Sequence, residues 1–249
     1  MQFIDTHCHI HEASYPLDPE AVLQHARNAG VKQLICVGTS RESSHRAVQF
    51  AAEHESVFAS IGVHPHDTKD GWNIEEFAEK PEVVAVGEIG LDYFYTHSSR
   101  ETQIEALQVQ IELALKHDLP IIFHVREAFD DFWPIFDNFH GIRGELHSFT
   151  DTKHNLEEGL RRGLYVGVNG ISTFTKSEPQ KEMFAAVPLK RLLLETDAPF
   201  LTPVPLRGKV NEPAYVMRIA EFHAQLRGIS LEEIAALTTT NAEMLFALS

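Results

Sequence analysis

Short apolar segments alternate with amphipathic segments along this sequence. The apolar segments are rich in β-branched and aromatic residues, and the segments between them space their apolar residues as one face of a helix does. Strands that alternate with helices in this way predict a parallel sheet. The predicted strands are Gln2–Ile4, Gln33–Val37, Val57–Gly62, Val83–Val86, Ile121–Phe123, Glu145–Leu146, Leu164–Val168 and Arg191–Leu194.

About eight β/α units predict an α/β protein with a TIM-type (β/α)8 barrel. The chain has 249 residues, a length that commonly forms one barrel, so we expect a single domain over residues 1–249. A doubly wound open sheet would normally carry a glycine-rich phosphate loop after its first strand, and Asp5 to His9 stand in that place instead. The barrel is therefore the favoured fold.

Helix signals flank several of the amphipathic segments. Pro19 to Asn28 is followed by Gly30, Arg100 to Lys116 stops before Pro120, and Glu212 to Leu226 opens with a proline in its first turn. Ser230 to Phe246 predicts an extra C-terminal helix or helix pair, in which Ser230 and Glu233 form a capping box.

Histidine and carboxylate residues recur where the predicted strands end. In a β/α barrel the carboxyl ends of the strands meet on one face, so side chains far apart in the sequence become neighbours. The candidate metal ligands are His7, His9, Glu88, His124, His147 and Asp197, and His64 follows the third predicted strand. Imidazole and carboxylate ligands suit divalent ions such as Zn, Mn, Mg or Co, and the lack of clustered cysteines argues against an iron–sulfur centre.

Each of these residues alone has a structural alternative. His7 and His9 could be buried and hydrogen-bonded in a strand, and Asp197 could cap a helix. Glu88 follows a buried apolar run, where a carboxylate costs several kcal/mol unless a cation pairs with it. Their joint occurrence at strand ends favours metal binding. Of the other histidines, His11 and His66 stay open, and the following are predicted to face solvent: His25, His45, His54, His97, His117, His140, His154 and His223.

The charge balance constrains partners and location. A formal net charge of −15 would repel a polyanion such as DNA, unless bound cations or a local basic patch reverse the field at the site. No apolar run approaches the ~20 residues that cross a bilayer, and the N-terminus lacks the pattern of a secretory signal. We therefore expect no membrane association and a cytoplasmic location, with Cys8 and Cys36 reduced.

Six ordered motifs resemble those of the TatD family of metal-dependent deoxyribonucleases, within the amidohydrolase-like barrel superfamily. The resemblance extends over essentially the whole chain. The motifs are Asp5 to His9, Gly62 to His66, Gly87 to Asp92, Pro120 to Arg126, His147 to Thr150 and Leu194 to Pro199.

The resemblance implies two divalent cations, Mg, Mn or Zn, at a site that hydrolyses phosphodiesters. His7, His9, Glu88 and Asp197 would surround one cation, and Glu88, His124 and His147 the other, so that Glu88 bridges the pair. Asp197 is the implied general base. His64 and Arg126 would contact phosphate, whereas Asp92 and Glu212 would hold the ligands in orientation.

Two positions depart from the family pattern. Val210 stands where members commonly have arginine before Asn-Glu-Pro, although Arg207 and Lys209 lie just upstream. Asp151 replaces a common glycine and adds negative charge near the expected site. Both changes leave the ligand set intact and weaken the case for DNA.

Three functions remain open from the sequence. The favoured one is a 3′–5′ deoxyribonuclease acting on single-stranded DNA or 3′ ends. The second is an amidase or esterase, such as an aminoacyl-tRNA deacylase, which Glu88 in place of a bridging carbamylated lysine and Arg126 disfavour. The third is a metal-binding barrel without catalysis. The oligomeric state is not predicted.

Overall fold

The computed structural model describes residues 1–248. Its strands are β1 (Phe3–Cys8), β2 (Val31–Val37), β3 (Val57–Ile61), β4 (Val83–Asp92), β5 (Ile121–Arg126), β6 (Gly144–Leu146), β7 (Tyr165–Val168) and β8 (Leu192–Leu194). They lie in one sheet in the order of the sequence, and the pairs β3–β4, β4–β5, β5–β6 and β7–β8 are parallel. Sequential parallel strands separated by helical segments are the pattern of a β/α barrel.

The segment that follows β8 returns to β1. The backbone N–H of Asp197 donates to the carbonyl of His7 at 2.8 Å, and the N–H of His9 donates to the carbonyl of Ala198 at 2.7 Å. Thr6 adds a side-chain hydrogen bond from its hydroxyl to the carbonyl of Leu194. The last strand therefore meets the first, which confirms the predicted (β/α)8 barrel.

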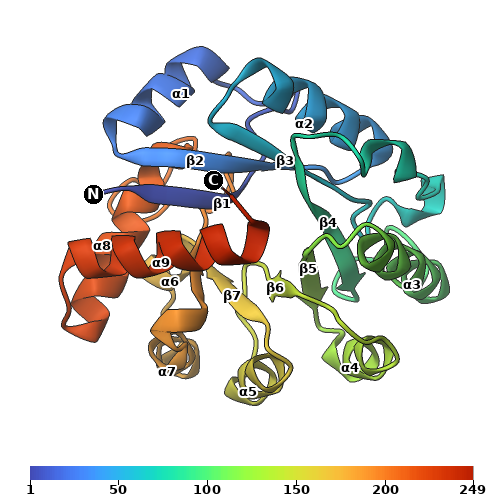
Figure 1. The fold of residues 1–249 in the computed structure, drawn as a ribbon. Coiled ribbons are helices and arrows are strands. Elements are labelled where there is room, and N and C mark those ends of the chain that lie inside the picture. Colours follow the sequence, from blue (N-terminus) through green and yellow to red (C-terminus); the bar gives the residue numbers. More distant parts are fainter. Residues whose placement is uncertain (249) are drawn as a thin grey trace. The chain divides into compact units, whose positions relative to one another are not determined.

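The chain divides into two compact units. The first consists of residues 1–35 and 148–248. Its helices are α1 (Pro19–Asn28), α5 (Lys153–Arg161), α6 (Ile171–Phe174), α7 (Glu178–Ala186), α8 (Val216–Arg227) and α9 (Leu231–Phe246), with 3-10 turns η3 (Leu189–Arg191) and η4 (Pro213–Tyr215). Helix α9 lies against α8 and β1 (Figure 1), and the amide of Asn241 donates to the carbonyls of Leu189 and Leu192, both at 2.8 Å.

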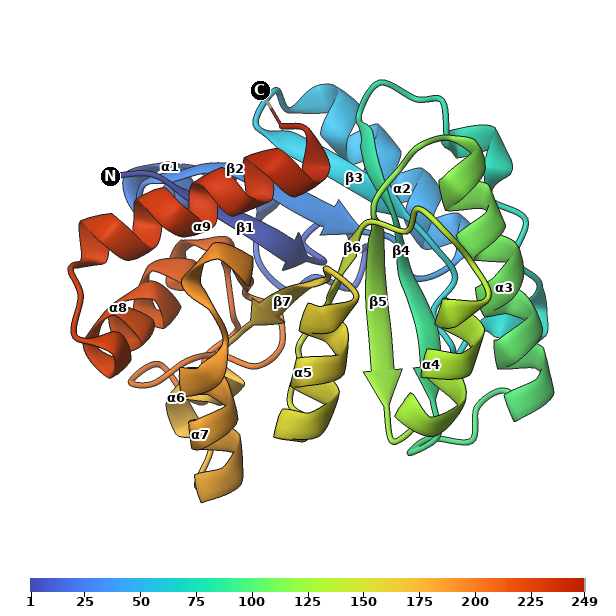
Figure 2. The ribbon, with the colours of Figure 1, turned by 60° about the horizontal axis from the view of Figure 1, so that its bottom comes forward.

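The second unit consists of residues 36–147. Its helices are α2 (Arg41–Glu53), α3 (Arg100–Lys116) and α4 (Phe129–Asp137), with 3-10 turns η1 (Thr68–Asp70) and η2 (Glu75–Phe77). Strands β4 and β5 run side by side, with α3 against β4 and α4 against β5 (Figure 2). Between these layers the side chains of Ile89, Phe123 and Phe132 are fully buried.

The predicted helices are largely confirmed. Helices α1 and α3 have the bounds expected from the sequence, and the extra C-terminal helix α9 begins at an N-cap Ser230 whose side chain accepts from the N–H of Glu233. The segment expected to start a helix at Glu212 instead forms η4 and then α8. After β3 the chain makes η1 and η2 where an amphipathic helix was expected, because Gly62, Pro65 and Gly71 interrupt the segment.

Among the described residues, none of the helices combines the length and the apolar character that crossing a membrane requires.

Candidate metal centre

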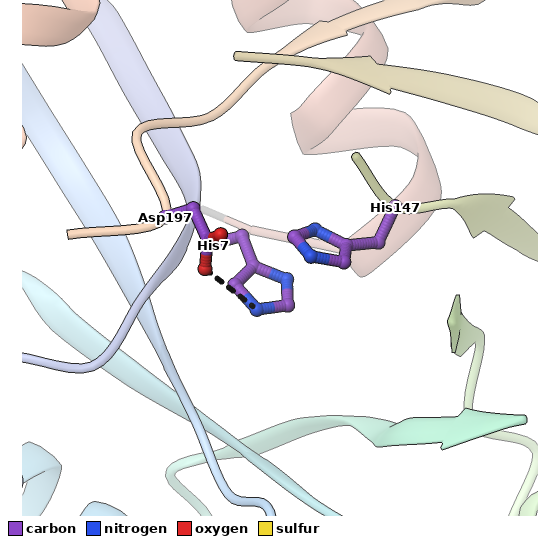
Figure 3. Close-up of side chains that lie close together, drawn as sticks. All are labelled: His7, His147 and Asp197. Carbon is purple, nitrogen blue, oxygen red and sulfur yellow. Dashed lines mark ion pairs between the residues drawn. The ribbon is translucent and has the colours of Figure 1, made fainter. Parts of the chain in front are cut away.

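In the first unit, ligand-type atoms from β1 and from the segment after β8 lie close together. His7 lies within β1 and His9 directly after it, and their Nε2 atoms are 3.2 Å apart. Asp197 Oδ1 is 3.3 Å from His9 Nε2 and 3.9 Å from His7 Nε2. Figure 3 shows the ion pair between His7 and Asp197, and it also labels His147, a residue of the second unit. Two imidazoles and a carboxylate form a donor set that fits a divalent cation.

Asp5 connects the two segments that carry this cluster. Its carboxylate accepts from the N–H of Thr196 at 2.8 Å and from the Thr196 hydroxyl at 2.6 Å. Burial raises the pKa of Asp5 well above its ordinary value, although these hydrogen bonds oppose the rise. The neighbouring Asp197 has a φ of 59°, an unusual backbone conformation for a non-glycine residue. Asp5 therefore positions Asp197, a role that sequence reasoning missed although a carboxylate inside a buried strand was its signal.

In the second unit, the carboxylate of Glu88 lies among three imidazoles. Glu88 Oε1 is 2.8 Å from His124 Nδ1 and 3.7 Å from Nε2 of both His64 and His147. The ligand-type atoms of His64, Glu88 and His124 all lie within 4.8 Å of one another. Burial and the nearby His124 lower the pKa of His64 well below its ordinary value, so this imidazole is neutral, the form that binds metals.

Asp92 holds His124 in place. Its Oδ2 is 3.0 Å from His124 Nε2 and 3.0 Å from His66 Nε2. Burial alone would raise the pKa of Asp92, but the hydrogen bonds from His124, the Tyr95 N–H and His66 outweigh it and lower the pKa far below its usual range. With Nε2 on Asp92, the Nδ1 atom of His124 faces Glu88.

The two carboxylates beside His124 favour its protonated form. Burial would lower the pKa of His124, but hydrogen bonds to Asp92 and Glu88 raise it above its ordinary value. The ring of His124 thus lies between two buried carboxylates. A metal ion ligated by Glu88 would compete with this proton, as expected where metal binding and protonation share ligands. The residues present therefore fit a metal.

The remaining predicted site residues have different surroundings. The exposed guanidinium of Arg126 lies over the ring of Phe94, with its carbon 3.9 Å from the centroid. The carboxylate of Glu212 contacts His25 Nδ1 at 3.0 Å and the hydroxyl of Tyr215, and none of these partners is an expected ligand. Glu212 follows an extended loop, and this places its carboxylate beside α1.

Several predicted residues lie in a different place from the one that the sequence indicated. His7, Glu88 and His124 lie inside their strands and not after them, because β1, β4 and β5 extend beyond the apolar runs that predicted them. His223, expected to face solvent, is fully buried. His66, which the sequence left open, contacts Asp92.

Comparison with known proteins agrees with this geometry. The family model described as TatD related DNase matches residues 4–247. The uncharacterized metal-dependent hydrolase YabD of Bacillus subtilis (strain 168) is 38% identical over 253 residues, which cover 98% of this chain and 99% of the relative. The 3′-5′ ssDNA/RNA exonuclease TatD of Citrobacter rodentium is 35% identical over 244 residues, or 93% of each chain. The crystal structure of YjjV, a TatD homologue from Escherichia coli K12, superposes with a TM-score of 0.92 at 31% identity and covers 99% of this chain and 98% of its own.

Proposed function

The chain belongs to the TatD-related DNase family of metal-dependent hydrolases, and we propose that it removes nucleotides from the 3′ ends of single-stranded DNA. The observation that carries this proposal is the Glu88 cluster, in which a buried carboxylate faces imidazoles from three other segments. A relative named as a 3′-5′ ssDNA/RNA exonuclease is 35% identical to this chain, and the match covers 93% of it. We further propose that residues 1–249 act as one functional domain in the cytoplasm.

The proposed cofactor is a pair of divalent cations, with Mg, Mn and Zn as candidates. One cation is assigned to His7, His9 and Asp197, and the other to His124 and His147, with Glu88 shared between them. Support comes from the donor chemistry of each cluster, which combines imidazole nitrogen with carboxylate oxygen. Bound divalent ions would lower the pKa of a water molecule and balance the charge of a phosphodiester.

The protein's own groups supply proton transfer and substrate positioning. Asp197 is the proposed general base, since its carboxylate is partly exposed and able to take a proton from the attacking water. Arg126 offers N–H donors along the edge of its guanidinium for a phosphate oxygen. The neutral imidazole of His64 contributes a hydrogen bond to phosphate and no charge. Asp92 fixes the orientation of His124. We propose that Glu212 likewise helps to hold the metal ligands in orientation.

Metal titration of the stripped protein tests this function. Wild type, Glu88→Ala and the exposed control Glu112→Ala on α3 are loaded with Mg, Mn or Zn, and metal content and nucleotide release from 3′-ended single-stranded DNA are measured. We expect two bound ions and release of nucleotides by wild type and control. Glu88→Ala should bind fewer ions and lose at least about a hundredfold in rate, the upper end of what losing a residue that supports a metal costs.

The same assay separates the rival functions. A fully loaded wild type that hydrolyses acyl esters but leaves DNA intact would make the protein an amidase or esterase, such as an aminoacyl-tRNA deacylase. Full metal occupancy without hydrolysis of either substrate would make it a non-catalytic metal-binding barrel.

A further inference from the structure

Exposed rings on the segment after β4 form a group with two side chains from elsewhere in the second unit. We name it the ring platform and define it as Phe94, Tyr95, His97, His66 and Arg126. The side chains of Phe94 and Tyr95 are among the exposed large hydrophobic ones, at 48% and 42% accessible. Adjacent exposed aromatic residues leave apolar area in water, and such patches commonly mark binding sites.

The members of the ring platform hold one another in place. The rings of Phe94 and Tyr95 meet edge to face, with centroids 4.7 Å apart, and Tyr95 stacks on His97 at 5.6 Å with an interplanar angle of 24°. The guanidinium carbon of Arg126 lies 3.9 Å from the Phe94 centroid and 5.1 Å from that of Tyr95. His66 completes the group through an edge contact with Tyr95. The aromatic surface is therefore ordered before any ligand arrives.

One carboxylate joins the ring platform to the candidate metal ligands. Asp92 Oδ1 accepts from the backbone N–H of Phe94 at 3.0 Å and of Tyr95 at 3.1 Å. Its Oδ2 contacts the imidazoles of His124 and His66. The loop that carries the rings is thus anchored to the side chain that orients His124.

We propose that the ring platform stacks an unpaired base of single-stranded nucleic acid beside the metal-binding residues of the second unit. Every base has a π face, so aromatic rings bind single strands with little sequence preference, and Arg126 adds a planar cation to the surface. A paired base lies within its own stack and cannot reach the rings, so the platform selects single strands. This inference rests on the proposed nuclease function and names how the substrate is held.

The charge of the molecule strengthens this assignment. A net charge of −15 gives little long-range attraction for a polyanion, so contacts to the bases are needed beside the local phosphate contacts of Arg126 and His64. Base stacking is such a contact, and its strength depends little on the charge of the protein.

Binding of two probes to the metal-loaded enzyme tests the platform. The probes are a short phosphorothioate oligothymidylate, which resists cleavage, and an abasic strand of the same length and linkage. Fluorescence anisotropy is measured for wild type and for the double variant Phe94→Ala with Tyr95→Ala. Phe94→Tyr with Tyr95→Phe keeps both rings, and Met244→Ala removes an even more exposed apolar side chain on α9.

We expect the double alanine variant to bind oligothymidylate at least about tenfold more weakly and the abasic strand unchanged, whereas the ring-retaining and Met244→Ala proteins match wild type. Equal binding of oligothymidylate by the alanine variant and wild type would overturn the platform, and so would equal losses for both probes. If wild type binds neither probe, the platform is overturned too.

Cleavage kinetics keep this inference separate from the proposed function. If wild type binds oligothymidylate through the rings but releases no nucleotides from ordinary DNA, the nuclease function fails and the platform stands. If wild type cleaves DNA and the alanine variant keeps its KM, the platform fails and the nuclease function stands.

Discussion

The surroundings of a histidine decide its protonation, as His124 and His223 show. His124 lies between two carboxylates, which raise its pKa, whereas His223 lies in apolar surroundings with Arg227 beside it. Arg227 donates to His223 Nδ1 at 2.7 Å, and the opposite nitrogen Nε2 donates to the hydroxyl of Ser172 at 3.1 Å. Both ring nitrogens are thus used by the neutral form. The expectation of a solvent-facing His223 was wrong because the residue continues the buried stripe of Val216, Ile219 and Ala220, a helical spacing visible in the sequence.

Protonation of His223 should destabilise the fold. Burial, followed by the charge of Arg227, lowers its folded pKa well below 6.5, so the unfolded chain takes up the proton first and stability is lost as the pH falls below about 6.5. Replacing His223→Gln should flatten the pH dependence of the unfolding free energy by up to about 1.4 kcal/mol per pH unit below that point. Urea unfolding from pH 7.5 to 5.5 measures this. His140→Gln, at an exposed position, is the control, and an unchanged slope in the His223 variant would refute the assignment.

At the scale of elements, periodicity predicted helices better than strands. Helices α1 and α3 matched because Gly30 and Pro120, just beyond them in the sequence, mark where they end independently of the fold. Strand β4 was predicted to stop at Val86, yet it continues through Glu88 to Asp92. The prediction followed apolar character, and the polar residues in the second half of β4 belong to the site and not to the core.

Strand ends and residue types were enough to predict which candidate ligands lie close together within each unit. The contacts around them could not be predicted. Whether Asp92 faces His124 or solvent depends on the orientation of a side chain in a twisted strand, and the stacking of Arg126 on Phe94 depends on the path of a loop. Asp5 was missed for the same reason, since its partner Thr196 is distant in sequence.

Gly90 lies where β4 comes very close to β5. It pairs in register with His124, and a Cβ added there would lie 1.8 Å from the carbonyl oxygen of His124. Gly90→Ala should therefore force the strands apart, lowering the unfolding free energy by about 3 kcal/mol or more and weakening metal binding through His124. The control Gly208→Ala has a positive φ but open space, so about 1–2 kcal/mol from backbone strain is expected. Denaturant unfolding and metal content of the two variants measure the difference; equal losses would contradict the close approach.

At the scale of the whole molecule, charge and proposed substrate oppose each other. The chain carries 36 acidic and 21 basic residues. Bound cations and the edge of Arg126 would attract phosphate locally, but approaching DNA first meets a negative field. The affinity for the proposed substrate and the rate at which the two meet would therefore be set by different parts of the protein.

Salt should consequently affect this enzyme differently from a basic nuclease. Raising monovalent salt from about 10 to about 150 mM shortens the Debye length from about 30 to about 8 Å and screens the repulsion. At saturating metal, kcat/KM for single-stranded DNA should stay level or rise. A basic protein would instead show a log–log slope of about −0.7 for each phosphate that it neutralises. A steep decline measured across this range would argue for phosphate contacts as the main source of affinity.

Helix α9 packs against β1. The Thr239 hydroxyl of α9 donates to the carbonyl of Gln2, just before β1, and Glu243 forms an ion pair with Lys32 of β2. The ribosome adds roughly 5–20 residues per second, so the roughly 220 residues between Cys8 and Leu231 take on the order of 10–40 s to synthesise. During most of that time β1 has been synthesised, but Asp197 has not. Helix α9 follows later still. The nascent chain therefore carries the histidines of β1 without their folded surroundings, and a cation bound by them would gain the carboxylate of Asp197 only after that residue has been made.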